Sequence, residues 1–289
     1  MIYQEPRFLP AADRFVLIEF GNEMNLELNF MAQGLATAIV DSGLKGVVES
    51  APCFASLLVH YDPDAISAAD LRRELTALVG NLGSTADIEL PSRLFYLPAV
   101  YNDPWTKACV EDYSAKIKPK TWDPEYVAEI NGLEGPEQVK RVHSGTEYWI
   151  ASLGFWPGLP FMMALDPRSV ITAPKYNPPR TWTPQGTIGM GGASTAIYPV
   201  QTPGGYQIFA RTPIPIWDPA QRFDVFRDSI CLFRPGDRVK FEPISVEEFE
   251  WCEAKVKEGT YVYNVNAYQK FSVGQYKQWL TTINPKDRF

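Results

Sequence analysis

Residues 187–212 read TIGMGGASTAIYPVQTPGGYQIFART, and this stretch decides the fold of the larger part of the chain. Three short runs of apolar and β-branched residues lie within it, at 187–190, 196–200 and 207–212, and glycines and prolines separate them. A fourth short run lies upstream, at Ile171–Ala173. Short strands at this spacing, with turn signals between them, predict a β-barrel or a sandwich rather than a parallel sheet.

The first part of the chain has a different pattern, in which strands alternate with helices. Apolar residues recur at helical spacing from Leu26 to Val40, and Gly43 stands where such a helix ends. Ser67 and Asp70 resemble a capping box that opens a second helix. The strands expected around these helices are Phe15–Phe20, Lys45–Ala51, Ser56–Tyr61 and Ala86–Leu90. The order β-α-β-β-α-β is typical of a ferredoxin-like domain.

The composition changes near Pro91, which marks the first domain boundary. A strand at Leu94–Val100 precedes a region of short helices from Asn102 to Glu147. Helix-like sequence returns at the end of the chain, where Ser245 and Glu248 fit a capping box. We therefore predict an α+β protein with a small ferredoxin-like α/β domain at residues 1–91 and a barrel at residues 92–245. A helical C-terminal extension, residues 246–289, is expected to pack on the barrel.

The charge balance restricts the partners. The formal net charge is −7, and basic residues form no cluster, which argues against nucleic acid and anionic membranes. The uncharged run from Trp149 to Leu165 is shorter than the roughly 20 residues of a spanning helix, and prolines interrupt it. The N-terminal residues lack the apolar core of a signal peptide, so we expect a cytoplasmic protein with reduced cysteines. Its four cysteines and two histidines lack metal-ligand spacing, and no metal site is predicted.

The loop LGFWPGLPFMMALDPR, residues 153–168, is a candidate functional segment. Three prolines and two glycines among large apolar residues, Gly158 included, indicate a specified backbone shape. Loops bear function more often than core elements do. The alternative is a buried turn that closes one end of the barrel.

Arg180 and the glycines that follow it form a second candidate. A guanidinium among prolines and threonines is suited to hold a carboxylate or phosphate with its planar fork. The motif GMGG, with Gly189, Gly191 and Gly192, could bring backbone N–H groups near an anion. The alternative for these glycines is a barrel hairpin.

The segment from Tyr206 to Arg211 is a third candidate. If it is a regular strand, alternation puts Gln207 and Arg211 on one face, where they could grip an amide and an anion. The alternative is a solvated strand face.

His143 is a candidate general base because imidazole titrates near neutrality. No GxSxG motif or recognisable nucleophilic cysteine accompanies it, which weakens that interpretation.

Taken together, the segments GFWPGLPFMMALDPR, PPRTWTPQGTIGMGGASTAIYPVQTPGGYQIFARTP and RFVLIEF resemble the allophanate hydrolase subunit 1 family, which includes the B-type subunit of 5-oxoprolinase and the kinase A inhibitor-type proteins. The carboxyltransferase region of urea carboxylase is similar to four further segments: YNDPWTKACVEDYSAKIKP, INGLEGPEQV, KYNPPRTWTP and GTYVYNVNAYQKFSVGQYKQWL. The resemblance extends from about Asp13 to the C-terminal tail.

This resemblance implies that the barrel is cyclophilin-like and that the chain works with a partner similar to allophanate hydrolase subunit 2 or to the C-type subunit of 5-oxoprolinase. It implies an ATP-driven complex that acts on a small urea- or 5-oxoproline-like amide, as a biotin-dependent carboxyltransferase or as an amide or lactam hydrolase. ATP would be bound by the complex, and any biotin would sit on a separate carrier, since the Met-Lys-Met attachment motif and a P-loop are absent here.

In this interpretation Arg180, Arg211 and His143 are the expected catalytic residues. The expected substrate-binding residues are Tyr206, Gln207, Gly158, Gly189, Gly191 and Gly192. An alternative function of a different class is a binding protein that inhibits a sensor histidine kinase.

Overall fold

The computed structural model describes residues 1–289, and their contacts divide the chain into two compact units. Unit 1 comprises Met1–Ser92 together with Tyr268–Ile283. Unit 2 comprises Arg93–Ala267 together with Asn284–Phe289.

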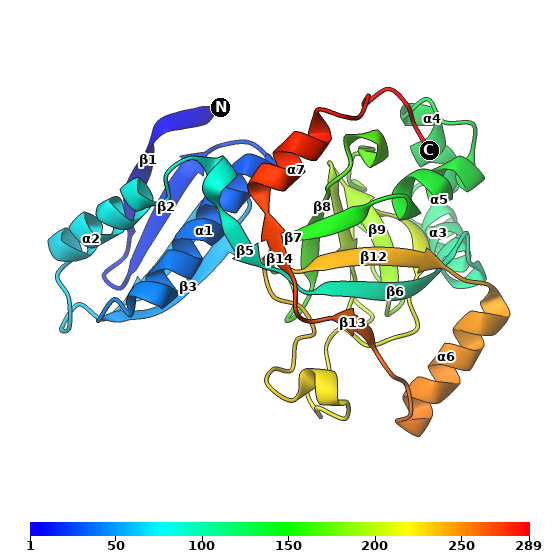
Figure 1. The fold of residues 1–289 in the computed structure, drawn as a ribbon. Coiled ribbons are helices and arrows are strands. Elements are labelled where there is room, and N and C mark those ends of the chain that lie inside the picture. Colours follow the sequence, from blue (N-terminus) through cyan, green and yellow to red (C-terminus); the bar gives the residue numbers. More distant parts are fainter. The chain divides into compact units, whose positions relative to one another are not determined.

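Unit 1 is built on a four-stranded antiparallel sheet with two helices (Figure 1). Across the sheet the strands are β1 (Ile2–Ala11), β2 (Phe15–Gly21), β4 (Ser56–Tyr61) and β3 (Val47–Cys53). The helices are α1 (Leu26–Ser42) and α2 (Ala68–Asn81).

Alternating burial along β2 explains how this unit forms its core. Val16, Ile18 and Phe20 are buried, and they belong to one apolar cluster with residues of β4, α1 and α2. Helix α1 begins after Asn25, whose side chain accepts a hydrogen bond from the Glu27 N–H at 2.8 Å. It ends at Gly43, which has a φ of 59°, a conformation that favours glycine. The predicted strand Ser56–Tyr61 and both predicted helices are confirmed.

The ferredoxin-like arrangement is not confirmed. Residues expected to form its last strand instead make a 3₁₀ turn, η1 (Thr85–Asp87), and the short strand β5 (Glu89–Pro91). Strand β5 pairs only with β14 (Lys270–Ser272), and the edge position beside β2 belongs to the N-terminal strand β1. Strand β1 was not predicted because its side chains are exposed or half-buried, so they show no apolar pattern.

Unit 2 contains a closed barrel of seven strands, which confirms the α+β class and the barrel over the sandwich. Strand β11 pairs with β6 and so closes the ring. In ring order the strands are β6 (Leu94–Tyr101), β12 (Arg238–Pro243), β7 (Glu147–Leu153), β8 (Pro160–Ala164), β10 (Ser194–Ile197), β9 (Thr187–Gly191) and β11 (Gln207–Arg211). The segment Ile171–Ala173 is not a strand, because only Ala173 pairs, with Gly192.

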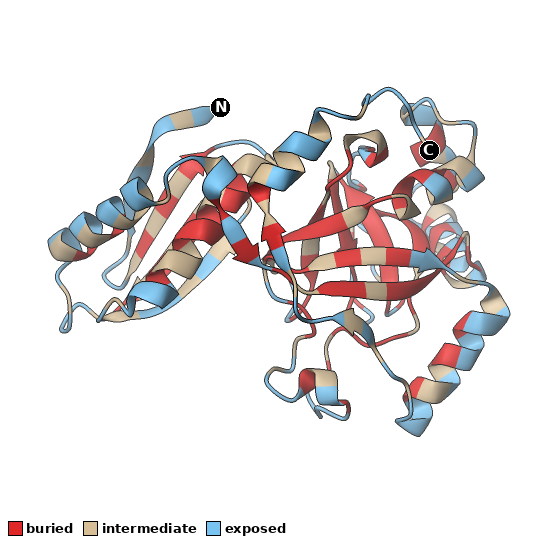
Figure 2. Ribbon diagram, in the orientation of Figure 1, coloured by how far each residue is buried: buried red, intermediate tan, exposed pale blue.

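Helices cover parts of this barrel. Three lie between β6 and β7 in the sequence: α3 (Pro104–Lys116), α4 (Asp123–Ile130) and α5 (Pro136–Ser144). Helix α6 (Val246–Glu258) follows β12 and buries one stripe against the unit (Figure 2). The capping box at Ser245 and Glu248 is present as predicted. The remaining elements are η2 (Pro167–Ser169), η3 (Asp224–Phe226) and β13 (Asn264–Asn266).

The contacts divide the C-terminal tail differently from the expectation. Helix α6 and β13 belong to unit 2, but β14 and α7 (Val273–Leu280) belong to unit 1. Strand β14 pairs with β5, and Lys277 of α7 donates hydrogen bonds to Glu27 and Thr85. Hydrogen bonding to unit 1 is therefore the physical reason that 246–289 is not one extension.

Candidate functional site

The loop between β7 and β8 forms one wall of a small pocket. Phe155 stands at its tip, 67% exposed and with a φ of 66°, which is strained for a residue other than glycine. Gly158 also has a positive φ, 77°, and a Cβ there would lie 3.3 Å from Ile216 O and Cys231 Sγ. The loop shape therefore depends on Gly158, whose backbone packs against Ile216 and Cys231.

The pocket behind this loop has a volume of about 120 Å³, and we call it the Tyr206 pocket. Lys175 is the only charged residue that lines it, and its Nζ lies 5.4 Å from the centroid of the Tyr206 ring. Lys175 forms no ion pair with an acidic side chain, so its ammonium group is available to a ligand. The full lining is Phe155, Leu159, Phe161, Lys175, Ala196, Tyr198, Gly204, Gly205 and Tyr206.

The three glycines of the GMGG motif shape the sheet beside this pocket. A Cβ on Gly191 would lie 2.5 Å from the Tyr206 ring, and one on Gly189 would lie 2.4 Å from Gln207 O. Gly192 has a φ of 63°, and its N–H donates to Ala173 O at 2.7 Å. Gly189 and Gly191 therefore allow close packing, and Gly192 occupies a turn. These are the features of a barrel hairpin, which is the alternative interpretation of this motif.

Arg180 lies behind the pocket and is 1% exposed. Its Nη1 donates to the carbonyl oxygen of Tyr206 at 2.5 Å, and its Nε and Nη2 donate to Thr183. The guanidinium also lies 4.5 Å from the centroid of the Tyr176 ring. These bonds hold the backbone of Tyr206 in place rather than present a fork to solvent.

Gln207 belongs to a buried polar cluster around Asp123. Lys120 donates to both Asp123 and Gln207, and burial lowers the pKa of its ammonium group. Asp123, fully buried, also accepts from Tyr176 Oη at 2.5 Å and from Ile208 N at 2.7 Å. Every polar group named here has a partner, which is typical of a structural network.

His143 lies in the barrel interior, where it is 0% exposed. Its Nδ1 is 2.8 Å from Tyr101 Oη, and its Nε2 is 3.2 Å from Thr195 Oγ1. Rings of Tyr148, Phe209 and Phe241 surround it. Burial lowers the pKa of His143 to about 3, so the imidazole is neutral at physiological pH.

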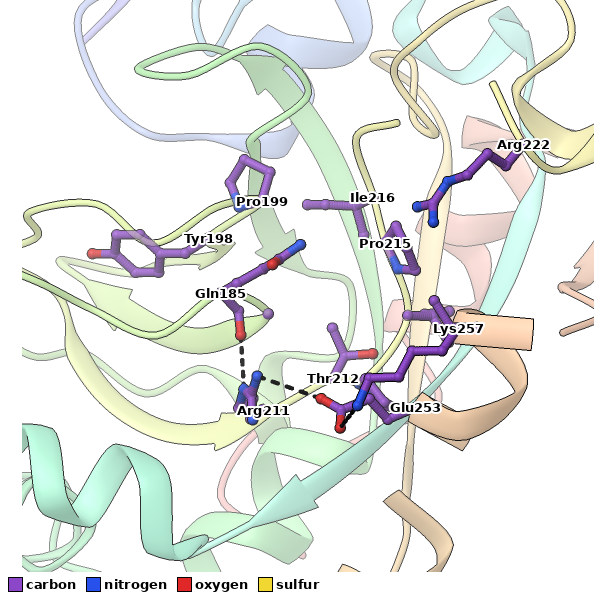
Figure 3. A pocket seen from close by; sticks show the side chains of 14 residues that line it. Gln185, Tyr198, Pro199, Arg211, Thr212, Pro215, Ile216, Arg222, Glu253 and Lys257 are labelled. Atoms are coloured by element: carbon purple, nitrogen blue, oxygen red, sulfur yellow. Dashed lines mark hydrogen bonds and ion pairs between the residues drawn. The ribbon is translucent and has the colours of Figure 1, made fainter. Parts of the chain in front are cut away.

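A second pocket, of about 210 Å³, contains Arg211 and is called the Arg211 pocket (Figure 3). Arg211 Nε donates to Gln185 O at 2.7 Å, and its Nη2 lies 4.0 Å from Glu253 Oε1. Burial lowers the pKa of this guanidinium. The other lining residues are Gly186, Tyr198, Pro199, Thr212, Pro213, Ile214, Pro215, Ile216, Arg222, Val256 and Lys257.

The structure thus separates the residues expected to act together. A register shift between Ile208 and Ala210 breaks the alternation of β11, and Gln207 and Arg211 do not line a common pocket. Sequence reasoning missed Lys175, Tyr198 and Thr212. Lys175 lay inside the quoted KYNPPR segment, and its position before two prolines was the signal that could have drawn attention to it.

A wider pocket, of about 660 Å³, contains Arg93 and Arg222, but Asp237 and Asp218 already pair with these two cations. A triphosphate would find no free guanidinium there, so the residues do not fit ATP. No group of three or more His, Cys, Asp or Glu side chains is arranged to hold a metal ion. No helix is long and apolar enough to span a membrane.

Comparison with known proteins identifies the family to which this chain belongs. The model of the family "Carboxyltransferase domain, subdomain C and D" matches residues 6–226. The chain belongs to this family. The match confirms the resemblance stated from the sequence.

The chain is similar to urea amidolyase from Lachancea kluyveri, with 32% identity over 280 residues. That alignment covers 95% of this chain but only 15% of the relative. The chain is also 32% identical to the B-type subunit of 5-oxoprolinase from Bacillus subtilis over 247 residues. This second alignment covers 82% of this chain and 92% of the relative.

A solved structure shares the fold of this family member. The Kluyveromyces lactis urea carboxylase matches with a TM-score of 0.82 and 28% identity, over 98% of this chain and 26% of that one. This chain therefore corresponds to one region of much longer proteins, and to nearly the whole of a shorter one.

Proposed function

We propose that this chain is one subunit of a heteromeric carboxyltransferase-like enzyme that acts on a small urea- or 5-oxoproline-like amide. Its partner would be a protein similar to allophanate hydrolase subunit 2 or to the C-type subunit of 5-oxoprolinase. The support is that the chain spans 92% of a relative named as a subunit and 15% of a urea amidolyase. Both relatives support a component that works together with other subunits or with other regions of a longer protein.

The observation that bears most directly on the substrate is the Tyr206 pocket. Its 120 Å³ admits a group of a few heavy atoms, and aromatic walls with one unpaired ammonium suit a small polar ring or amide. Lys175 would stabilise negative charge that develops on the amide oxygen during reaction. Burial raises the pKa of Tyr206, so its phenol stays protonated and serves as a hydrogen-bonding group rather than a base.

Arg180 and His143 would then contribute as positioning residues. Arg180 holds the carbonyl of Tyr206, and His143 links Tyr101 to Thr195 inside the barrel. Arg211 lines the separate Arg211 pocket and is not part of the Tyr206 pocket. ATP would be bound by another part of the complex, and a biotin carrier, where the reaction uses one, would be a separate protein.

The test is turnover by the assembled complex. This chain is co-purified with its partner, and ATP- and bicarbonate-dependent consumption of urea and 5-oxoproline is measured with and without a biotinylated carrier. We expect turnover of one of the two amides, and the carrier requirement separates a carboxylase from a lactam hydrolase. A complex that consumes neither amide under any of these conditions would refute the proposal.

A Lys175→Gln variant of the same complex tests the pocket. Because Lys175 is exposed and unpaired, the fold should be unchanged while kcat/KM falls by about tenfold or more. Lys118→Gln, also at an exposed position, is the control and should leave kcat/KM unchanged.

A further inference from the structure

The terminal nitrogens of Arg211 form no hydrogen bond within the chain. Nε is used by Gln185 O, but the nearest carboxylate oxygen to Nη2, on Glu253, is 4.0 Å away and outside hydrogen-bonding distance. The side chain is only 17% exposed. A mostly buried guanidinium with free N–H donors gains from an oxyanion that can accept from both terminal nitrogens.

The direction of this guanidinium is fixed by its surroundings. The bond to Gln185 O holds one edge, and the Cζ lies 5.1 Å and 5.0 Å from the ring centroids of Trp105 and Phe249. The two rings contact each other, with centroids 4.8 Å apart. The fork is therefore held in position before any ligand arrives, which lowers the entropy lost on binding.

Thr212 supplies a second, independent observation. It lines the same pocket, is 2% exposed, and its Oγ1 has no hydrogen-bond partner. A buried hydroxyl without a partner costs free energy unless a ligand or water satisfies it. Figure 3 shows Thr212 beside Glu253 in the wall of the pocket that also contains Arg211.

The remaining charges favour an anion of small size. Lys257 pairs with Glu253 at 3.1 Å, and Arg222 pairs with Asp218, so Arg211 is the cation of the lining that lacks a close partner. Pro199, Pro213 and Pro215 supply rigid walls without N–H donors. The volume of about 210 Å³ is too small for a nucleotide.

We propose that the Arg211 pocket is a binding site for a planar carboxylate-type oxyanion, held by the Arg211 fork and the Thr212 hydroxyl. Two sources share this chemistry, namely free bicarbonate and the carboxylate of an organic molecule. The site stands on its own geometry and does not depend on which amide the complex consumes.

The test is direct binding to the full chain without its partner. Isothermal titration calorimetry at constant ionic strength measures bicarbonate and acetate, with chloride as the competing salt. We expect at least one of the two to bind at a single site, and the stronger ligand identifies the source. Because the readout is binding, it is independent of turnover, so its failure is distinct from failure of the proposed function.

Two matched variants locate the site. Thr212→Val removes a hydroxyl that has no partner in the chain, so thermal stability should be unchanged while affinity falls about tenfold. Thr187→Val removes another unpartnered buried hydroxyl that lies outside the pocket lining, and it should change neither. Arg211→Gln should abolish binding.

The proposal is overturned if neither anion binds the wild-type chain. It is equally overturned if binding survives Arg211→Gln, or if Thr187→Val weakens it as much as Thr212→Val does.

Discussion

The guanidinium of Arg180 donates a hydrogen bond to the carbonyl oxygen of Tyr206 at 2.5 Å, from a position that is 1% exposed. In the sequence, Arg180 has the features of an anion-binding residue. In the structure, it holds the backbone of Tyr206, which lines the Tyr206 pocket. Because Nε and Nη2 donate to Thr183 and the guanidinium packs on the Tyr176 ring, Arg180 stabilises the wall of the pocket and does not line its cavity.

Replacement of Arg180 by lysine should therefore destabilise the folded protein. A single ammonium cannot reach Tyr206 O and Thr183 together, and the free energy of unfolding should fall by about 2–4 kcal/mol. Chemical denaturation measures this change. A variant as stable as wild type that has nonetheless lost turnover would instead identify Arg180 as a substrate-contacting residue.

Gly204 and Gly205 provide a paired test of the Tyr206 pocket. A Cβ on Gly204 would lie 2.4 Å from Tyr198 Oη, whereas one on Gly205 would have no neighbour nearer than 3.6 Å. Gly204→Ala should therefore displace Tyr198 and lower kcat/KM of the complex by about tenfold or more. Gly205→Ala should stay within about twofold of wild type. Equal effects of the two variants would show that Tyr198 does not shape the functional pocket.

Burial of His143 makes stability depend on pH in a defined direction. Its pKa is lowered to about 3 in the folded chain, while the unfolded chain takes up a proton near the ordinary pKa of about 6.5. The unfolded state therefore binds more protons between these values, and stability falls as the pH falls below about 6.5, by about 1.4 kcal/mol per pH unit.

The comparison is urea denaturation of wild type and His143→Gln at pH 7, 6 and 5. The variant should be less stable at pH 7 but should show a shallower loss toward pH 5, because other titrating groups contribute equally to both proteins. Parallel pH profiles would contradict the assignment of a neutral, buried imidazole.

The Lys120–Asp123 pair should show strong coupling. Asp123→Asn leaves the half-buried ammonium of Lys120 without its carboxylate, and we expect a loss of about 3 kcal/mol in the free energy of unfolding. Adding Lys120→Met should recover part of that loss. A double-mutant cycle by urea denaturation measures the coupling, and strictly additive losses would exclude the pairing.

Much of the fold was predictable because local signals agreed with tertiary packing. The strand at Ser56–Tyr61 shows buried residues at every second position, and the Ser245 capping box starts α6 where the sequence indicates. The N-terminal strand was not predictable, since β1 is an edge strand whose side chains reach little of the core. Its pairing with β2, and that of β14 with β5, depend on partners distant in sequence.

The candidate site was predictable in its segments but not in its geometry. The loop at 153–168, the KYNPPR segment and Tyr206 do meet around one pocket. The alternation that would unite Gln207 with Arg211 fails at the register shift in β11, which no periodicity reveals. The sequence likewise could not show that His143 and Arg180 are buried, because burial depends on the closed barrel.

The proposed function requires that this chain and its partner be inactive apart, which is decided by titrating the purified chain into a fixed amount of its purified partner and measuring turnover of the amide that the complex consumes. We expect no turnover by either protein alone and a rate that rises and saturates at a fixed molar ratio. Full turnover by this chain without the partner, or by the partner without this chain, would refute the proposed function.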